Sequence, residues 1–208
     1  MKQGLLIIIT GSIGAGKKTV RRVVAETNPR LTYLPVFTNR MPRRKEISGA
    51  EFRFLRQNEF QKAKEQGTFL FTFQDQGCEY GLDKEATEKA LKEGKKVILE
   101  RPHSAAKELR KMFPGRYTRT IDIHIPAERL SSRVKKNLRR APLYQVKKVL
   151  SLAKQDNNDT EDFDVVLNNY ELKRTAKRCN QSIEKRLEYI KAVEEGKDIP
   201  SDYVIKNS

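Results

Sequence analysis

Cysteine, histidine and tryptophan are scarce in this 208-residue sequence, which has two cysteines, two histidines and no tryptophan. Cys78 and Cys179 are far apart and form no CxxC pair, so we expect free thiols in a reducing compartment rather than a disulfide framework or a zinc site. His103 and His124 have no partner pattern, and the sequence assigns them no role. The apolar run Leu5–Ile9 is too short to span a bilayer and ends in glycines rather than in a cleavage site, so we expect a cytoplasmic protein without a membrane partner.

Acidic residues are also few: 27 Asp and Glu stand against 43 Lys and Arg, which gives a formal net charge of +16 and a pI near 9.9. Such a balance attracts nucleotides, nucleic acid or an acidic membrane surface, and charge alone does not choose among them. Basic clusters at Lys135–Arg140 and Lys173–Arg186 would suit a nucleic-acid-binding face. Aromatic residues do not interleave with these clusters in a stacking pattern, so we rank nucleic acid last among the partners.

The order of apolar runs and helical patterns predicts the fold class. The length suits one domain, and strands that alternate with helices indicate a mostly parallel sheet covered on both sides, hence an α/β fold with three layers. We expect strands at Leu5–Ile9, Leu31–Phe37, Lys96–Glu100, Thr120–Ile125 and Phe163–Leu167. We expect helices at Lys17–Thr27, Lys84–Glu93, Ala127–Leu138 and Leu172–Val193.

Two segments depart from this alternation. Between residues 38 and 82, short aromatic alternations flank one small helix around Phe60, which predicts an inserted, partly antiparallel lobe. The basic segment Lys135–Pro142 contains a proline breaker between two helices and predicts a small lid at about residues 135–145. We expect Gln155–Asp162 to be a loop, the domain to cover residues 1–192, and residues 193–208 to be a tail.

The segment Gly11–Thr19 fits the phosphate-binding pattern GxxxxGK between a buried strand and a helix, as that motif requires. Its glycines let backbone N–H groups face one concavity, the helix N-terminus adds positive partial charge, and the lysine reaches the terminal phosphates. We therefore predict nucleotide-phosphate binding by Gly11, Gly14, Ala15, Gly16, Lys17, Lys18 and Thr19, with Lys17 also catalytic.

One position of this loop departs from the motif. Lys18 stands where a Ser or Thr normally ligates magnesium, and this departure bears on catalysis more than on phosphate binding. A second lysine can itself supply part of the charge neutralisation that the metal usually gives.

The sequence resembles the guanylate kinase family over nearly the whole chain up to about Lys191. After the loop, Thr38–Arg43 is similar to the family's TTRxPR segment, followed by Glu46, Gly49 and Phe52–Phe54 in the register of GExxGxxYxF. Further landmarks of the family are matched by Phe60, Gly67–Leu70, Gly77–Gly81, Gly94–Glu100 and Phe163–Asn169.

This resemblance implies ATP and Mg²⁺ as cofactors and a role for several residues. Arg40, Arg43 and Tyr80 would hold the phosphate of an acceptor in the inserted lobe, with Phe52 and Phe71 also at the acceptor. Asn168 would lie by the donor adenine, and Glu100 would organise magnesium through water. Lid-region arginines that would stabilise the transferring phosphoryl group are Arg133, Arg139 and Arg140.

The departures from the family gather at the positions that read guanine. Residues that align with hydrogen-bonding groups of the family are Val36, Phe52, Phe71, Leu82 and Pro102. Each missing hydrogen bond would cost about 1 to 3 kcal/mol of guanine recognition, so this sequence does not itself support specificity for GMP.

Three functions therefore stand. The first is ATP-dependent phosphoryl transfer to a phosphorylated small molecule, GMP or a related nucleotide, and its variant is a kinase for a ribose 1,5-bisphosphate-type phosphosugar. The second is a guanylate-kinase-like binding module that has lost catalysis, which Lys18 and Pro102 favour and the retained phosphate contacts oppose. The third is nucleic-acid binding. The sequence does not indicate an oligomeric state.

Overall fold

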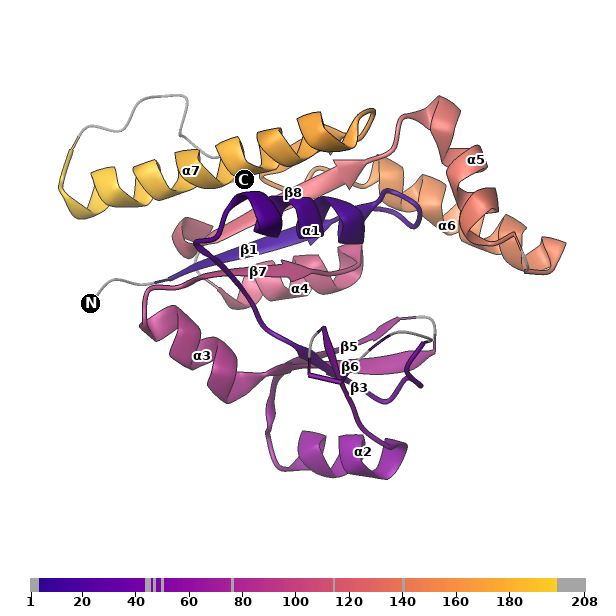
Figure 1. Cartoon of the computed structure of the whole chain (residues 1–208), viewed down its shortest axis with the longest axis horizontal. Helices are drawn as coiled ribbons and strands as arrows, with labels where there is room; N and C mark the ends of the chain where they lie inside the picture. Colours follow the sequence, from indigo (N-terminus) through magenta and orange to yellow (C-terminus); the bar gives the residue numbers. More distant parts are fainter. Residues whose placement is uncertain are drawn as a thin grey trace. The chain divides into compact units, whose positions relative to one another are not determined.

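A computed structural model describes residues 4–43, 46, 48–49, 51–75, 77–113, 115–139 and 141–197 (Figure 1). The strands are β1 (Leu5–Thr10), β2 (Leu31–Tyr33), β3 (Val36–Thr38), β4 (Phe52–Phe54), β5 (Phe69–Asp75), β6 (Cys78–Asp83), β7 (Lys96–Glu100), β8 (Thr118–His124) and β9 (Val165–Asn168). The helices are α1 (Lys17–Thr27), α2 (Gln57–Glu65), α3 (Lys84–Lys92), α4 (His103–Met112), the short 3₁₀ helix η1 (Gly115–Tyr117), α5 (Ala127–Asn137), α6 (Leu143–Asn158) and α7 (Leu172–Glu194).

The larger sheet has five strands in the order β2-β7-β1-β8-β9, and β8 pairs in parallel with both β1 and β9. Every residue of β1 is buried, because the strand is central and both of its faces are covered. Helices α1 and α7 pack against each other, and α4 packs on β8 (Figure 1). The predicted α/β fold with a mostly parallel sheet is confirmed.

The chain separates into two compact units, one formed by Met1–Leu5 and Arg30–Val97 and the other by Leu6–Pro29 and Ile98–Ser208. The first unit contains a four-stranded sheet in the order β4-β3-β6-β5, in which β6 is antiparallel to β3 and β5. The expected aromatic lobe therefore does contain antiparallel pairs. The predicted boundaries of domain, lobe, lid and tail stay predictions, and residues 198–208 lie outside the described residues.

One face of the four-stranded sheet packs on helix α2 through aromatic rings. The Phe69 ring lies 4.7 Å from the Phe60 ring and 5.4 Å from the Phe37 ring, measured between centroids. A Cβ atom on Gly81 would lie 2.6 Å from the Phe69 ring, so the glycine is needed for this packing. The opposite face is left for the residues of the predicted acceptor site.

Two predictions of secondary structure are wrong. The run Leu31–Phe37 is not one strand but two, because Leu34 and Pro35 separate β2 from β3 and the two strands join different sheets. The expected loop at Gln155–Asp162 begins later, since α6 continues to Asn158. Its last turns are anchored by buried Ala153 and by Asp156, whose Oδ1 lies 3.9 Å from Nδ1 of His103.

Within the described residues, no helix is both long enough and apolar enough to cross a membrane.

Candidate phosphate-binding and acceptor sites

The loop between β1 and α1 is built around three glycines. Gly11, Gly14 and Gly16 all have positive φ angles, of 144°, 88° and 90°. Gly16 is the N-cap residue of α1 and makes no side-chain capping hydrogen bond. The first turn of α1 is therefore not capped by a side chain, and the N-terminus of such a helix attracts anions.

Two of these glycines are also required by their neighbours. A Cβ atom on Gly11 would lie 2.4 Å from the backbone oxygen of Ile123, and one on Gly16 would lie 2.9 Å from Nδ2 of Asn169. Lys17 Nζ donates to the backbone oxygens of Gly11 at 2.8 Å and Ser12 at 3.1 Å. The ammonium group is therefore held at the loop, where a terminal phosphate would be neutralised.

Two side chains that are distant in the sequence donate hydrogen bonds to the backbone of the loop. Asn169 Nδ2 donates to the backbone oxygen of Ala15 at 2.7 Å, and Arg133 donates to the same oxygen at 3.4 Å and to the backbone oxygen of Asn169 at 2.9 Å. Arg133, expected in the lid region, therefore lies against the loop. Asn168, which was predicted to contact adenine, is exposed at the end of β9.

Sequence reasoning missed Asn169, although a signal was present. The backbone N–H of Asn169 donates to the oxygen of His124 at 2.9 Å, so the residue extends the pairing of β9 with β8 by one position. A polar pair directly after a buried parallel strand lies at the carboxyl edge of the sheet, where the phosphate loop also lies.

We predict that Asn169→Ala loosens the loop without unfolding the protein. The oxygen of Ala15 would lose its better donor in a buried position, which costs about 1 to 3 kcal/mol. The KM for ATP should rise about 10-fold, measured by steady-state kinetics, and the melting temperature should fall by a few degrees. Asn158→Ala, at an exposed asparagine at the end of α6, is the matched control. A wild-type KM in Asn169→Ala would contradict this role.

Magnesium would be held mainly by phosphate oxygens and water. Lys18 and Thr19 are exposed on the first turn of α1, and the described residues contain no cluster of three His, Cys, Asp or Glu that could hold a metal ion. Glu100 is a partly buried carboxylate in the electrostatic environment of Lys17. Burial raises the pKa of Glu100, while Lys17 and Arg21 act in the opposite direction. One carboxylate together with substrate phosphates is a usual donor set for Mg²⁺, so the residues present fit this ion.

A buried pair beside the loop was not expected from the sequence. His103 Nε2 lies 2.6 Å from Asp122 Oδ1, and Asp122 is the neighbour of Thr10 in the parallel pairing of β1 and β8. Burial raises the pKa of Asp156, while His103 and Lys17 oppose the shift. The electrostatic environment of Lys17 therefore includes two carboxylates, Glu100 and Asp156.

In the first unit, Arg40 is held by a two-pronged ion pair. Its Nη1 lies 3.0 Å from Glu46 Oε2 and its Nη2 lies 3.1 Å from Oε1, while the Arg43 backbone N–H donates to Oε2 at 2.8 Å. Burial raises the pKa of Glu46, but the hydrogen bonds from Arg40 and Arg43 outweigh it and the net shift is downward. The Arg43 side chain itself is exposed. Glu46 thus orients one of the two predicted phosphate-binding arginines.

Aromatic rings surround this guanidinium. Arg40 Cζ lies 5.0 Å from the centre of the Phe52 ring and 5.4 Å from that of Phe54. Tyr80 stacks on Phe73 at 5.1 Å, and burial raises the pKa of its hydroxyl while Arg40 opposes the shift. The structure therefore brings Arg40, Phe52 and Tyr80 together on one face of the four-stranded sheet.

Four of the five positions where the sequence departs from the family's hydrogen-bonding groups form a single row across that sheet, whereas Pro102 precedes α4. In register, Phe52 pairs with Val36, Val36 pairs with Leu82, and Leu82 pairs with Phe71. We call these four residues the apolar row. Val36 and Leu82 are fully buried, and no member of the row carries a side-chain hydrogen-bonding group. The face therefore offers stacking and cation–π contacts next to the Arg40 guanidinium, which pairs with Glu46, rather than a pattern of donors and acceptors.

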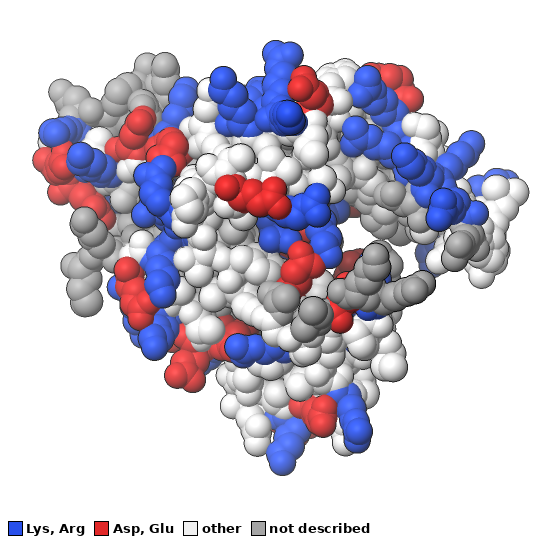
Figure 2. Space-filling view, in the orientation of Figure 1, with Lys and Arg blue, Asp and Glu red and all other residues white. Residues whose placement is uncertain are grey.

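The remaining predicted residues are not brought into either group. Arg139 is exposed in the turn after α5, and Arg140 lies outside the described residues. Pro102 is the N-cap residue of α4 and has no side-chain cap. Figure 2 shows Lys and Arg side chains gathered around α5. The expected basic face at Lys173–Arg186 is incomplete, because Arg186 is only 2% exposed.

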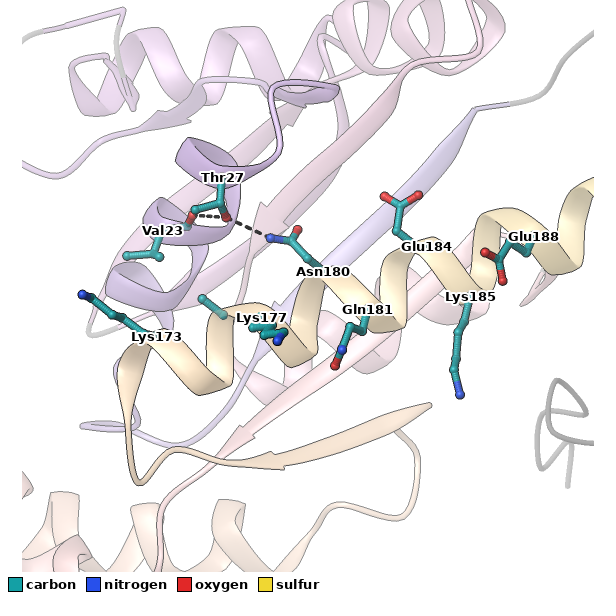
Figure 3. A pocket seen from close by; sticks show the side chains of 10 residues that line it. Val23, Thr27, Lys173, Lys177, Asn180, Gln181, Glu184, Lys185 and Glu188 are labelled. Carbon is teal, nitrogen blue, oxygen red and sulfur yellow. Dashed lines mark hydrogen bonds between the residues drawn. The ribbon is translucent and has the colours of Figure 1, made fainter.

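An open groove of about 920 Å³ lies between α1 and α7 (Figure 3). Asn180 Nδ2 donates to Thr27 Oγ1 at 2.9 Å across it. No predicted site residue lines the groove, and its wall carries both lysines and glutamates, so we do not assign the phosphate chemistry to it. The lining residues are Val23, Thr27, Lys173, Ala176, Lys177, Asn180, Gln181, Glu184, Lys185 and Glu188.

A buried strand, a glycine loop and a lysine at the start of the next helix define a phosphate-binding protein of the P-loop class. The family model described as guanylate kinase matches residues 3–186. The chain belongs to the guanylate kinase family, which confirms the resemblance seen in the sequence.

Individual relatives agree with this assignment. The guanylate kinase of Trichormus variabilis is 36% identical over 111 residues, or 53% of this chain and 56% of the relative. That of Aster yellows witches'-broom phytoplasma is 40% identical over 111 residues, or 53% of each chain. These matches span about half the length of the curated relatives. The crystal structure of guanylate kinase from Anaplasma phagocytophilum has a TM-score of 0.72 at 18% identity over 93% of both chains, which shows the common fold.

Proposed function

We propose that this protein transfers the γ-phosphoryl group of ATP to the phosphate of a small-molecule acceptor, either GMP or a related nucleotide. The observation that carries the proposal is the phosphate loop: the backbone oxygen of Ala15 accepts from Asn169 and Arg133, and those of Gly11 and Ser12 accept from Lys17. Family membership supports the same reaction. The two units would each bind one substrate, the donor at the loop and the acceptor at Arg40.

The transfer needs no nucleophilic side chain from the protein. An oxygen of the acceptor phosphate attacks the γ-phosphorus while the bond to the β–γ bridging oxygen breaks, and ADP leaves. Lys17 and the loop amides would neutralise the transferring and leaving oxygens, and Arg133 keeps the loop in shape. Arg40 and Tyr80 would position the acceptor phosphate, with Arg43, Arg139 and Arg140 as further cations of the site. Glu100 would help to hold Mg²⁺ through water, and the ion would supply further neutralisation of the phosphate charge.

The apolar row makes a specific prediction about the acceptor. Because the row carries no hydrogen-bonding side chain, we expect kcat/KM for GMP, AMP and dTMP to agree within about 10-fold. ADP release in a coupled assay measures this, with ribose 1,5-bisphosphate as the acceptor without a base. A preference for GMP above about 1,000-fold would contradict our account of the row, although it would leave the phosphoryl transfer intact.

A variant pair tests whether this face contacts the base. Phe71→Glu introduces a carboxylate into the row and should raise the ratio of kcat/KM for GMP to that for AMP by about 10-fold, since it offers guanine one acceptor. Thr72→Glu is the matched control, because neighbouring residues of a strand point to opposite faces. Equal ratios in the two variants would place the base elsewhere.

A binding module without catalysis is the second candidate, favoured by Lys18 in the loop and by Pro102 after β7. It predicts nucleotide binding without turnover. Release of ADP with any acceptor of the panel would exclude it, whereas nucleotide binding with no turnover for the whole panel would replace the kinase proposal.

A further inference from the structure

Three arginines converge at the amino edge of the five-stranded sheet, at the opposite end of the strands from the phosphate loop. Arg119 is the second residue of β8, Arg110 belongs to the last turn of α4, and Arg186 lies in α7. We call Arg110, Arg119 and Arg186 the arginine cluster. All three belong to the second compact unit.

The buried carboxylate of Asp164 is the negative charge that interacts with all three arginines of the cluster. Asp164 Oδ1 lies 3.1 Å from Arg110 Nη2 and 3.7 Å from Arg186 Nη2. Its other oxygen already accepts from the backbone N–H of Thr120 at 2.7 Å and from the Thr120 hydroxyl at 2.9 Å. The Asp164 side chain is 4% exposed, and both of its oxygens already have partners, so it can accept few further hydrogen bonds.

The charges of the arginine cluster do not balance. Three guanidinium groups face one carboxylate, and Asp162, the other acid near Arg110, is 60% exposed and pairs with Lys107 at 2.8 Å. Burial lowers the pKa of Arg119 to about 10, with repulsion from Arg186 and Arg110 adding to the shift and Asp164 opposing it. Burial lowers the pKa of Arg186 as well, and Arg110 adds to that shift.

Arg186 shows the same imbalance in its hydrogen bonds. Its side chain is 1% exposed, and neither Nη1 nor Nη2 has a hydrogen-bond partner among the described residues. The nearest ring is that of Tyr189, 5.6 Å from Cζ, which cannot replace a carboxylate. A buried charge without full hydrogen bonding raises the free energy of the folded state, so a buried guanidinium is normally paired with an anion.

The arginine cluster is accessible on one side. The Arg110 side chain is 26% exposed. Within the described residues, Arg119 donates a hydrogen bond through Nε alone, to Ser182 Oγ at 2.9 Å. The terminal nitrogens of Arg119 thus stay available. Planar guanidinium forks bind the paired oxygens of phosphate or carboxylate better than a spherical halide.

We propose that the arginine cluster is a second anion site, which takes a small oxyanion such as inorganic phosphate or the phosphate group of a nucleotide. The anion binds at the terminal nitrogens of Arg119. Arg110, whose Nη1 already donates to Thr120 Oγ1 at 3.2 Å and to the backbone oxygen of Asp162, and the buried Arg186 contribute positive potential. This site is independent of the proposed kinase reaction, since it shares no residue with the phosphate loop.

The test compares the melting temperature with increasing inorganic phosphate at constant ionic strength, set with sodium chloride. The variants are Arg119→Gln and, as the matched control, Arg116→Gln, which removes the same charge from an exposed residue three positions earlier. At saturating phosphate, wild type and Arg116→Gln should gain about 5 °C, and Arg119→Gln should lose at least half of that gain. The same titration with AMP shows whether the phosphate source is inorganic or a nucleotide.

Two results separate this site from the phosphate loop and from a structural role. Lys17→Ala should retain part of the phosphate response, because its arginine cluster is intact. Without phosphate, Arg119→Gln should melt at or above the wild-type temperature, since a repelling cation has been removed, whereas a purely structural arginine would leave a less stable protein. Equal phosphate responses in Arg119→Gln and wild type, or a response abolished by Lys17→Ala, would overturn the proposal.

Discussion

Replacing Lys17 with alanine should lower kcat/KM for ATP by about 100- to 1,000-fold, the usual loss when one preorganised cationic donor leaves a phosphoryl-transfer site. Lys17 Nζ is held by the oxygens of Gly11 and Ser12, at the position where the terminal phosphates would lie. Its loss removes about 3 to 4 kcal/mol of transition-state stabilisation. Coupled ADP release, with the best acceptor of the panel, measures the effect.

The control for Lys17→Ala is Arg22→Ala, which removes one positive charge from the same helix. The Arg22 side chain is 66% exposed and forms an ion pair with Glu26 one turn on, so this variant should keep wild-type kinetics within about 2-fold. A loss shared by both variants would point to the general field of the helix. A Lys17→Ala enzyme with wild-type kcat/KM would remove the loop from the mechanism.

Replacing Gly11 with alanine should produce the largest loss of stability at the site. The added Cβ would lie 2.4 Å from the backbone oxygen of Ile123, and the φ angle of 144° is one that L side chains rarely adopt. Backbone strain alone costs about 1 to 3 kcal/mol, and β8 must shift as well. We expect the melting temperature to fall by about 5 to 10 °C and nucleotide binding to be lost.

Gly115→Ala is the matched control for this glycine. Gly115 has open space around its Cα and lies at the start of the short 3₁₀ helix before β8. Its replacement should change the melting temperature by less than about 2 °C, since surface substitutions usually have small effects. A Gly11→Ala protein as stable as Gly115→Ala would show that the loop adopts another conformation.

Sequence alone predicts the parts of this protein whose signals are local. One short stretch of sequence contains the buried run Leu5–Ile9, the loop glycines and the start of α1. The helix Lys17–Thr27 has the bounds that were expected. The strand Lys96–Glu100 is also as predicted. In each case the burial pattern and the flanking turn residues agree on one structure.

Pairings between distant residues were not predictable in this way. His103 and Asp122 belong to different elements, and the contact of Asn169 with Ala15 joins residues 154 positions apart. The apolar row required the register of four strands, and the reading of Leu31–Phe37 as one strand concealed that register. Arg186 was counted as a surface charge, because periodicity cannot tell which side of a long basic helix is buried.

The most direct test is isothermal titration calorimetry of ADP, with and without Mg²⁺, against the wild type and Lys17→Ala. Our account predicts that the tightest ADP site of the wild type loses at least 10-fold in affinity in Lys17→Ala, whose melting temperature should stay close to that of the wild type. A wild-type protein that gives no binding heat and whose melting temperature does not respond to ADP under either condition would contradict it.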